Sequence, residues 1–353
     1  MLDKEFWKDR KVLITGHTGF KGSWLTIWLL SMGAKVCGYS LEKYENDKLY
    51  NSIGISEEIN DIRGDILDLE KLNLTFKSFE PEIVFHMAAQ PLVRQSYKDP
   101  VNTFKTNIIG TVNILETLRT SESVKAAVII TSDKVYENKE WLYGYRETDR
   151  LGGKDPYSAS KGATEIVVNS YIESFFKESK INIATARAGN VIGGGDYSKD
   201  RLIPDCISSL QNKKTIQIRN PSSVRPWQHV LDPLHGYLLL AQKLYVDDSF
   251  TGAWNFAPKR SSIVTVKELV KQFTSIWGEG TYNITTTNDN YKETTFLNLD
   301  YTKSKFNLGW SPKLEFNDAL TLTVNWYKNE SNGNSYNLCL NQIDYFTRKI
   351  NNF

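Results

Sequence analysis

The sequence predicts an α/β fold, with a doubly wound parallel sheet and a smaller C-terminal α/β unit. Three observations support this prediction. Short apolar runs of strand length alternate with segments of helical periodicity, a glycine-rich turn follows the first run, and the rhythm changes after Gly189. Strands that alternate with helices are typical of βαβ units, in which helices cover both faces of a parallel sheet.

The predicted strands of the first half are short and rich in apolar residues: Lys11–Thr15, Ala34–Tyr39, Ile59–Arg63, Glu82–Met87, Lys125–Thr131 and Ile181–Arg187. The predicted helices among them are Phe20–Met32, Val101–Leu118 and Tyr157–Glu178. Because parallel strands need crossover helices, this order predicts one sheet for residues 1–189.

A loop of turn-forming residues, 193–200, precedes a less regular second half. Here we predict helices at Pro204–Gln211, Pro233–Leu244, Val266–Trp277 and Leu338–Ile350, with strands at Thr215–Ile218 and Trp254–Phe256. We assign residues 190–353 mainly to a substrate-binding unit. It is partly interleaved with the first unit, since it can supply the last strands of the main sheet.

Composition excludes several classes of function. The 353 residues are 40% hydrophobic and 24% charged, as in ordinary globular proteins, and the net charge of +2 offers no basic field for nucleic acid or anionic lipid. The N-terminal stretch is charged and no apolar run is long enough for a membrane span. Three scattered cysteines and four histidines show no metal-ligand spacing. We expect a cytoplasmic protein without a metal.

The glycine-rich turn has the pattern of a nucleotide-binding loop. It follows the first strand and opens the first helix, as Gly16-His17-Thr18-Gly19-Phe20-Lys21-Gly22. Glycines at this point permit a tight turn, a close approach of backbone to a pyrophosphate and close helix–strand packing, and the helix N-terminus favours anions. A tight turn alone would also explain the glycines, but the strand before and the helix after favour a Rossmann-type dinucleotide site.

The choice between NAD and NADP stays open at this level. No acid ends the second strand at Gly38–Leu41, where a ribose 2′-hydroxyl would bind, while Glu42 and Lys43 follow slightly late. Asp65, after the third strand, could accept from an adenine amino group or could simply cap a helix.

A tyrosine and a lysine four residues apart form the core of the predicted catalytic group. Tyr157 and Lys161 share one helical face, so the ammonium can lower the pKa of the phenol and make it a general base for an alcohol. Ser132, at the end of a predicted strand, could hydrogen-bond the same oxygen. The spacing alone is common on amphipathic helices, and it is the preceding nucleotide loop that favours catalysis.

These motifs together resemble the extended short-chain dehydrogenase/reductase family of nucleotide-sugar enzymes. The glycine loop, His86–Gln90, Thr131–Tyr136 and Tyr157–Lys161 stand in the family order. Longer stretches, Ala89–Ser96, Asn190–Asp196 and Arg225–Val230, resemble the 4,6-dehydratase branch that uses CDP-linked glucose. The resemblance runs from the first strand to about residue 260. It implies NAD as cofactor and adds Ile66, Ala88 and Ala89 to the cofactor site.

Ser132-Asp133-Lys134 separates dehydratases from epimerases within this resemblance. An epimerase needs only the serine, tyrosine and lysine, whereas a dehydratase also needs an acid for the departing 6-hydroxyl and a base for the C5 proton. The resemblance assigns these roles to Asp133 and Lys134. Because dTDP-glucose relatives carry Asp-Glu here, Lys134 favours the CDP branch. Another 4,6-dehydratase, a 4-epimerase and a non-enzymatic dinucleotide sensor are the alternatives.

The resemblance also implies a substrate site and an assembly. Matching positions suggest that the sugar nucleotide is held by Gln90, Arg94, Asn190, Arg201, Arg219, Arg225 and Asn255. A guanidinium such as that of Arg225 suits a diphosphate because it can bind bidentately. The family further implies a homodimer or homotetramer, and a product that enters deoxysugar synthesis for bacterial surface polysaccharide such as O-antigen.

Overall fold

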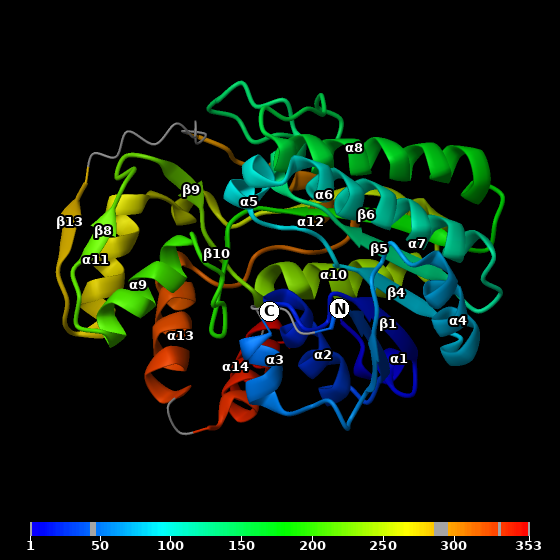
Figure 1. The fold of residues 1–353 in the computed structure, drawn as a ribbon, viewed down its shortest axis with the longest axis horizontal. Helices are drawn as coiled ribbons and strands as arrows, with labels where there is room; N and C mark the ends of the chain where they lie inside the picture. The colour runs from blue at the N-terminus through cyan, green and yellow to red at the C-terminus, as the bar shows by residue number, and fades with distance from the viewer. Residues whose placement is uncertain (1, 43–46, 286–295, 331–332, 352–353) are drawn as a thin grey trace.

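A seven-stranded parallel sheet forms the centre of the molecule (Figure 1). The computed structural model describes residues 2–42, 47–285, 296–330 and 333–351. The strand order is β11-β6-β5-β4-β1-β2-β3. The bounds are β1 Lys11–Thr15, β2 Lys35–Ser40, β3 Asn60–Arg63, β4 Ile83–His86, β5 Ala126–Ile130, β6 Asn182–Ala188 and β11 Gly252–Phe256. The order reverses between β1 and β4, and this switch point is where ligands bind in open α/β sheets.

Successive residues of a strand point to opposite faces of the sheet. Because both faces are buried, the inner strands are apolar at nearly every position. Val12 and Ile14 belong to one hydrophobic cluster and Leu13, between them, to the other. In the same way, Val128 and Ile129 on β5 lie in different clusters. A sheet buried on both faces explains the continuous apolar runs in the sequence.

Helices cover both faces of the sheet. The first face packs against α2 Phe20–Ser31 and α10 Leu231–Leu244, and α14 Ser335–Asn351 packs in turn against α2. The second packs against α4 Leu69–Phe79, α7 Gly110–Arg119 and α8 Pro156–Tyr171. Shorter helical segments connect these elements: α1 Lys4–Trp7, α3 Lys48–Ile53, α5 Val93–Lys98, α6 Pro100–Phe104, η1 Lys105–Ile109, η2 Asp133–Val135, η3 Ile172–Phe176, η4 Asp248–Phe250 and η5 Arg260–Ser262.

A smaller group of elements lies beside the carboxyl ends of the sheet strands, at the left of Figure 1. Its helices are α9 Leu202–Gln211, α11 Val266–Trp277 and α13 Phe316–Asn329, whereas α12 Thr302–Asn307 packs against β11 of the central sheet. Its short strands pair as β10 Gln228–His229 with β7 Val191–Ile192, β12 Ile263–Thr265 with β9 Val224–Pro226, and β13 Tyr282–Ile284 with β8 Ile216–Ile218. The main hydrophobic cluster continues into this group without interruption.

The structure confirms the predicted fold class, and most predicted elements lie within a few residues of their expected bounds. The helix predicted at Val101–Leu118 instead runs from α6 through a π-helical turn, η1, into α7. The sequence pattern also missed several helices: α1, α3, α4, α5, α12 and α13. β11 and α10, from the second half of the chain, join the central sheet and its covering layer.

Candidate active site

One large cavity, of about 1110 Å³, opens along the carboxyl edge of the central sheet. Its walls come from the glycine loop, the ends of β4, β5 and β6, the first turns of α8, and segments of the smaller C-terminal group. Because all seven strands are parallel, the loops that follow them gather at the same edge. The cavity therefore combines residues from both halves of the chain.

The glycine loop forms one wall of the cavity and depends on two of its glycines. Gly16 has φ +76°, and a Cβ there would lie 2.8 Å from the Ala88 amide nitrogen. A Cβ on Gly22 would lie 2.1 Å from the Gly16 carbonyl oxygen. Thr18, Gly19, Phe20 and Lys21 line the cavity as well. The loop thus folds tightly against β4 and brings the amino end of α2 to the cavity wall.

His17 does not line the cavity, although it belongs to the same loop. Its ring is fully buried, with Nε2 3.0 Å from Asp61 Oδ1 and Nδ1 2.9 Å from Ser40 Oγ. Burial alone would raise the pKa of Asp61, but hydrogen bonds from His17, Arg63 and Tyr50 hold it well below the usual range. His17 therefore anchors the loop to β2 and β3.

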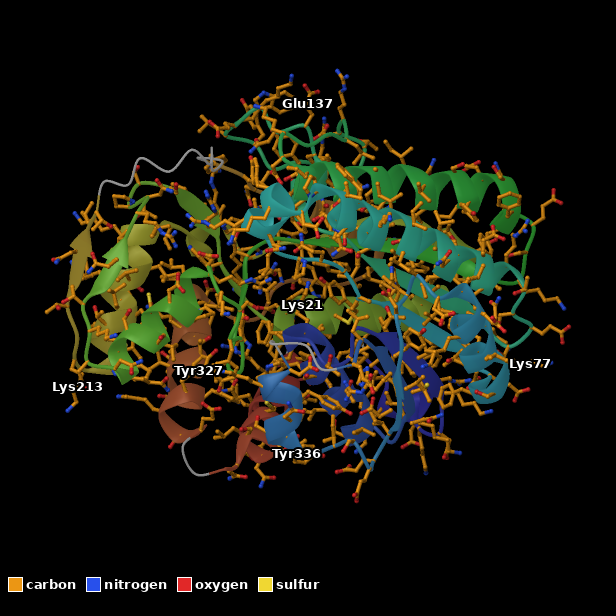
Figure 2. All side chains as sticks on the ribbon, in the orientation of Figure 1. Lys21, Lys77, Glu137, Lys213, Tyr327 and Tyr336 are labelled. Atoms are coloured by element: carbon orange, nitrogen blue, oxygen red, sulfur yellow. The ribbon has the colours of Figure 1, made fainter. Side chains whose placement is uncertain are left out.

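Lys21 places a cation in the middle of the molecule, whereas Lys77 and Lys213 lie at its periphery (Figure 2). Its ammonium lies 5.6 Å from the centre of the Tyr237 ring. Burial, followed by the charges of Lys161 and Arg201, lowers the pKa of Lys21 to about 7. An anionic ligand in the cavity would favour the charged form of this lysine.

Four further residues predicted for a cofactor, Asp65, Ile66, Ala88 and Ala89, line the same cavity. The Asp65 carboxylate accepts the Leu67 N–H at 2.9 Å. It does not cap the following helix, because Asp68 is the N-cap residue of α4. Of the residues after the second strand, Ser40 and Leu41 line the cavity, and Lys43 lies outside the described residues.

The predicted catalytic residues converge where β5 ends and α8 begins. Ser132 Oγ donates to Asp133 Oδ1 at 2.9 Å and hydrogen-bonds the Tyr157 side chain. Lys161 Nζ donates to the Ile130 carbonyl oxygen at 3.2 Å. The Lys134 ammonium lies 5.9 Å from the centre of the Tyr157 ring. All five side chains line the cavity.

Local structure fixes the start of α8. Asp155 is the N-cap residue and accepts the Ser158 N–H, and Pro156 occupies the first turn, where its missing N–H costs nothing. The Tyr157 N–H donates to Ser96 Oγ at 3.1 Å, which ties α8 to α5. Tyr157 therefore enters the cavity from a firmly held helix end.

Electrostatics at the site differ from the sequence-based expectation in one respect. Burial raises the pKa of Tyr157 to about 12, and the hydrogen bond with Ser132 opposes this only in part. The expectation that a nearby lysine lowers this pKa was therefore wrong for the chain alone. Burial also lowers the pKa of Lys161 to about 8 and raises the pKa of Asp133, which favours a protonated carboxyl.

Six of the seven residues predicted for a sugar nucleotide line the cavity: Gln90, Arg94, Asn190, Arg201, Arg219 and Arg225. Asn255 does not, since its side chain is buried and bonded to Tyr136, Tyr145 and Asp300. The Gln90 side chain bonds Thr103 and the Leu92 N–H, and so supports the loop after β4.

Sequence reasoning missed the carboxylates that accompany these arginines. Arg201 pairs with Asp196 at 3.0 Å, Arg94 with Asp200 at 3.4 Å, and Arg219 with Asp205 at 3.6 Å. Asp196 and Asp200 belong to the loop that the sequence marked only as turn-forming. Pairing holds the guanidinium groups in place at the cavity wall, where an incoming anion could compete for them.

Fold and site together define an extended short-chain dehydrogenase/reductase: a nucleotide loop at β1 and a Ser–Tyr–Lys group at β5 and α8 face one cavity. The GDP-mannose 4,6 dehydratase family model matches residues 13–323, and the chain belongs to that family. It is 45% identical over 345 residues to the CDP-glucose 4,6-dehydratase of Salmonella typhimurium, covering 96% of each chain. It is 25% identical to a human dTDP-D-glucose 4,6-dehydratase, covering 90% of each.

Solved structures share the fold across nearly the whole chain. UDP-glucose 4-epimerase of Thermotoga maritima, solved with UDP-glucose, is 26% identical with a TM-score of 0.78, over 90% of this chain and 98% of that one. The dTDP-glucose 4,6-dehydratase of Streptomyces venezuelae, solved with NAD and TYD, is 22% identical with a TM-score of 0.79, over 91% and 98%.

The described residues include neither a membrane-spanning helix nor a metal-binding cluster. Every helix among them is too short or too polar to span a lipid bilayer. The same residues contain no group of three or more histidine, cysteine or carboxylate side chains placed to hold a metal ion.

Proposed function

We propose that the chain is an NAD-dependent hydro-lyase that converts CDP-glucose to CDP-4-keto-6-deoxyglucose and water. The observation that carries this proposal is the convergence of Asp133 and Lys134 with Ser132, Tyr157 and Lys161 on one cavity. An acid and a base beyond the oxidising group are what elimination requires and epimerisation does not. The 45% identity to a CDP-glucose 4,6-dehydratase supports the choice of nucleotide.

The residues of the loop fit a dinucleotide. A Cβ at Gly22 or Gly16 would collide with backbone, so the loop can adopt this cradle only with glycine at both positions. No side chain caps the amino end of α2, a helix that lies wholly within the described residues, so its N–H groups are available to a pyrophosphate. Lys21 and Arg201 add positive charge nearby. NAD, when bound, supplies the acceptor that takes hydride from C4 of the sugar and returns it to C6.

The side chains divide the remaining chemistry. Tyr157 receives the C4 hydroxyl proton, which requires that the positive charge of a bound oxidised nicotinamide lower its raised pKa, and Ser132 hydrogen-bonds the same oxygen. Once C4 is a ketone, the C5–H is acidic, and Lys134 accepts that proton. Asp133, whose pKa is raised by burial, gives a proton to the departing 6-hydroxyl. When C6 is reduced, C5 takes up a proton again. Two protons are therefore removed, from the C4 hydroxyl and from C5, and two are returned, to the departing hydroxyl and to C5, so the net reaction is loss of one water.

Arg225, with Arg201 and Arg219, is proposed to hold the diphosphate, since these guanidinium groups line the part of the cavity formed by the second half of the chain. The division into residues 1–189 for the cofactor and 190–353 mainly for the substrate remains a proposal. So do a homodimeric or homotetrameric assembly, a cytoplasmic location and a role in surface polysaccharide synthesis.

The direct test supplies CDP-, dTDP-, GDP- and UDP-glucose in turn, with NAD or NADP, and measures the 4-keto sugar by its absorbance in alkali. We expect turnover with CDP-glucose and NAD. Preference for another nucleotide would indicate a different 4,6-dehydratase, and interconversion of 4-epimers without a keto product would indicate an epimerase. Cofactor binding without turnover of any substrate would favour the sensor.

A further inference from the structure

A buried carboxylate, Glu165, lies one helical turn beyond Lys161 on α8 and takes no part in the chemistry above. Only 3% of its surface is exposed. Arg187, on β6, donates to it from two nitrogens, Nε to Oε1 at 2.9 Å and Nη2 to Oε2 at 2.7 Å. A bidentate pair of this kind, out of contact with solvent, is among the most geometrically specific interactions in proteins.

The same carboxylate holds the carboxyl ends of two strands. The Thr131 hydroxyl donates to Oε1, and the Thr185 hydroxyl donates to Oε2 at 2.7 Å. Thr131 immediately precedes Ser132, and Thr185 lies on β6. One side chain therefore joins the helix that carries Tyr157 and Lys161 to the strand end that carries Ser132.

Glu165 is also the negative charge nearest in the chain to Lys161. The titratable groups that interact with Lys161 come from three elements: Glu165 on α8, Lys21 in the glycine loop and His86 on β4. Burial lowers the pKa of Lys161 to about 8, and Glu165 opposes that effect. Arg187 faces Glu165 from β6 and donates to its carboxylate. The Tyr136 hydroxyl accepts a hydrogen bond from the same guanidinium group.

We infer that Glu165 is a positioning residue of the active site: it fixes Ser132 relative to Tyr157 through Thr131, and it keeps a negative charge behind Lys161. The inference rests on the proposed function, because it concerns the residues that carry out the oxidation at C4. It makes two separable statements, one about geometry and one about charge.

Charge is tested with Glu165→Gln, which keeps the shape of the side chain. We expect the alkaline limb of the kcat profile to move to lower pH by about one unit, because an opposite charge nearby typically shifts a pKa by that much or more. NMR titration of lysines labelled at Cε gives a readout independent of turnover, in which the Lys161 signal should titrate at lower pH. Glu173→Gln is the matched control, as Glu173 is an exposed carboxylate further along the same helical segment, paired with Lys177.

Geometry is tested with Thr131→Val, which removes the hydroxyl and keeps the charge of Glu165. We expect kcat to fall roughly tenfold to a hundredfold at every pH, as a small misplacement of reacting groups does, with both limbs in place. Glu165→Asp keeps the charge on a shorter side chain, and its kcat should fall in the same way. These two variants therefore test the role of geometry even if Glu165→Gln does not fold.

Two results would overturn the inference while the wild-type protein remains active. The statement about charge is wrong if folded Glu165→Gln shows no shift in the alkaline limb or in the titration of Lys161. The statement about geometry is wrong if Thr131→Val and Glu165→Asp both keep the wild-type kcat. A wild-type protein that forms no 4-keto sugar contradicts the proposed function instead, so the two failures are distinguishable.

Discussion

Gly19 and Gly22 serve different purposes in the glycine loop, and paired alanine variants should separate them. At Gly22 the added methyl would lie 2.1 Å from the Gly16 carbonyl oxygen and 2.7 Å from His17 Cα, both backbone atoms that cannot rotate away. At Gly19 it would lie 3.4 Å from the Gly16 carbonyl oxygen, close to ordinary contact, and the backbone there is in the extended region that alanine adopts readily.

The magnitudes follow from those distances. Gly22→Ala gains about 1 kcal/mol of helix propensity, but overpacking against rigid backbone should cost about 3 kcal/mol or more, so the apoprotein should melt several degrees lower. Gly19→Ala should cost only about 0.5 kcal/mol of stability as a changed N-cap residue. Its methyl instead occupies space at the helix end where a pyrophosphate would approach, so NAD affinity should fall at least tenfold, about 1.4 kcal/mol.

Thermal melts of the apoprotein and calorimetric titration with NAD measure the two effects separately. A Gly22→Ala variant that melts at the wild-type temperature would refute the packing argument. A Gly19→Ala variant that binds NAD as tightly as the wild type would show that the pyrophosphate does not lie against this part of the loop. Each variant is the control for the other.

Other predictions concern the catalytic residues and acid stability. Tyr157→Phe should retain nucleotide binding and lose turnover by roughly 10²–10⁴-fold, as expected for a general base, and rates near the wild type would exclude that role. Lys134→Ala should still reduce the cofactor with bound substrate and then stall, seen as persistent nicotinamide absorbance without solvent deuterium at C5; normal exchange at C5 would identify another base. Arg225→Ala should raise the KM for the sugar nucleotide with little change in NAD affinity, and unchanged calorimetric affinity for the substrate would remove Arg225 from the site. Burial lowers the pKa of three histidines from 6.5 to about 3, so below pH 6.5 the unfolded state takes up protons that the folded state refuses. The three residues are His86, His229 and His235. The free energy of unfolding should therefore fall between pH 6.5 and about 3, by about 2 kcal/mol per histidine at pH 5. Denaturant titrations that show no loss of stability between pH 7 and 5 would contradict the burial of these histidines.

Several features of the site were predictable because they depend on short stretches of chain. The Tyr157–Lys161 pair shares a helical face through the period of the helix alone. The glycine loop was recognisable from a strand, a turn and a helix in immediate succession. Asp133 and Lys134 follow Ser132 directly, so their place at the end of β5 needed only the strand to be identified.

Contacts between distant segments were beyond the sequence. The turn-forming loop gave no sign that Asp196 and Asp200 pair with Arg201 and Arg94. Glu165 was indistinguishable from an ordinary helix carboxylate until β5 and β6 brought Thr131 and Thr185 to it. Asn107, within the π-helical turn η1, likewise donates through its side-chain amide to the Gln90 carbonyl oxygen and to Ser160 Oγ, contacts that no local pattern shows.

The sequence by itself predicted the fold class, most strands of the central sheet, the nucleotide loop and the candidates for the reacting groups, because periodicity and turn chemistry act between near neighbours. Tertiary structure alone decided that the strand expected from the second half of the chain pairs with β6, that the Asn255 side chain is buried in hydrogen bonds away from the cavity, and that the pKa of Tyr157 is raised instead of lowered. The common reason is that each of these outcomes depends on contacts between distant segments, and for the pKa of Tyr157 the largest contribution is desolvation. A charge is stabilised or penalised by everything packed around it, and that surrounding is assembled from residues that lie far apart along the chain.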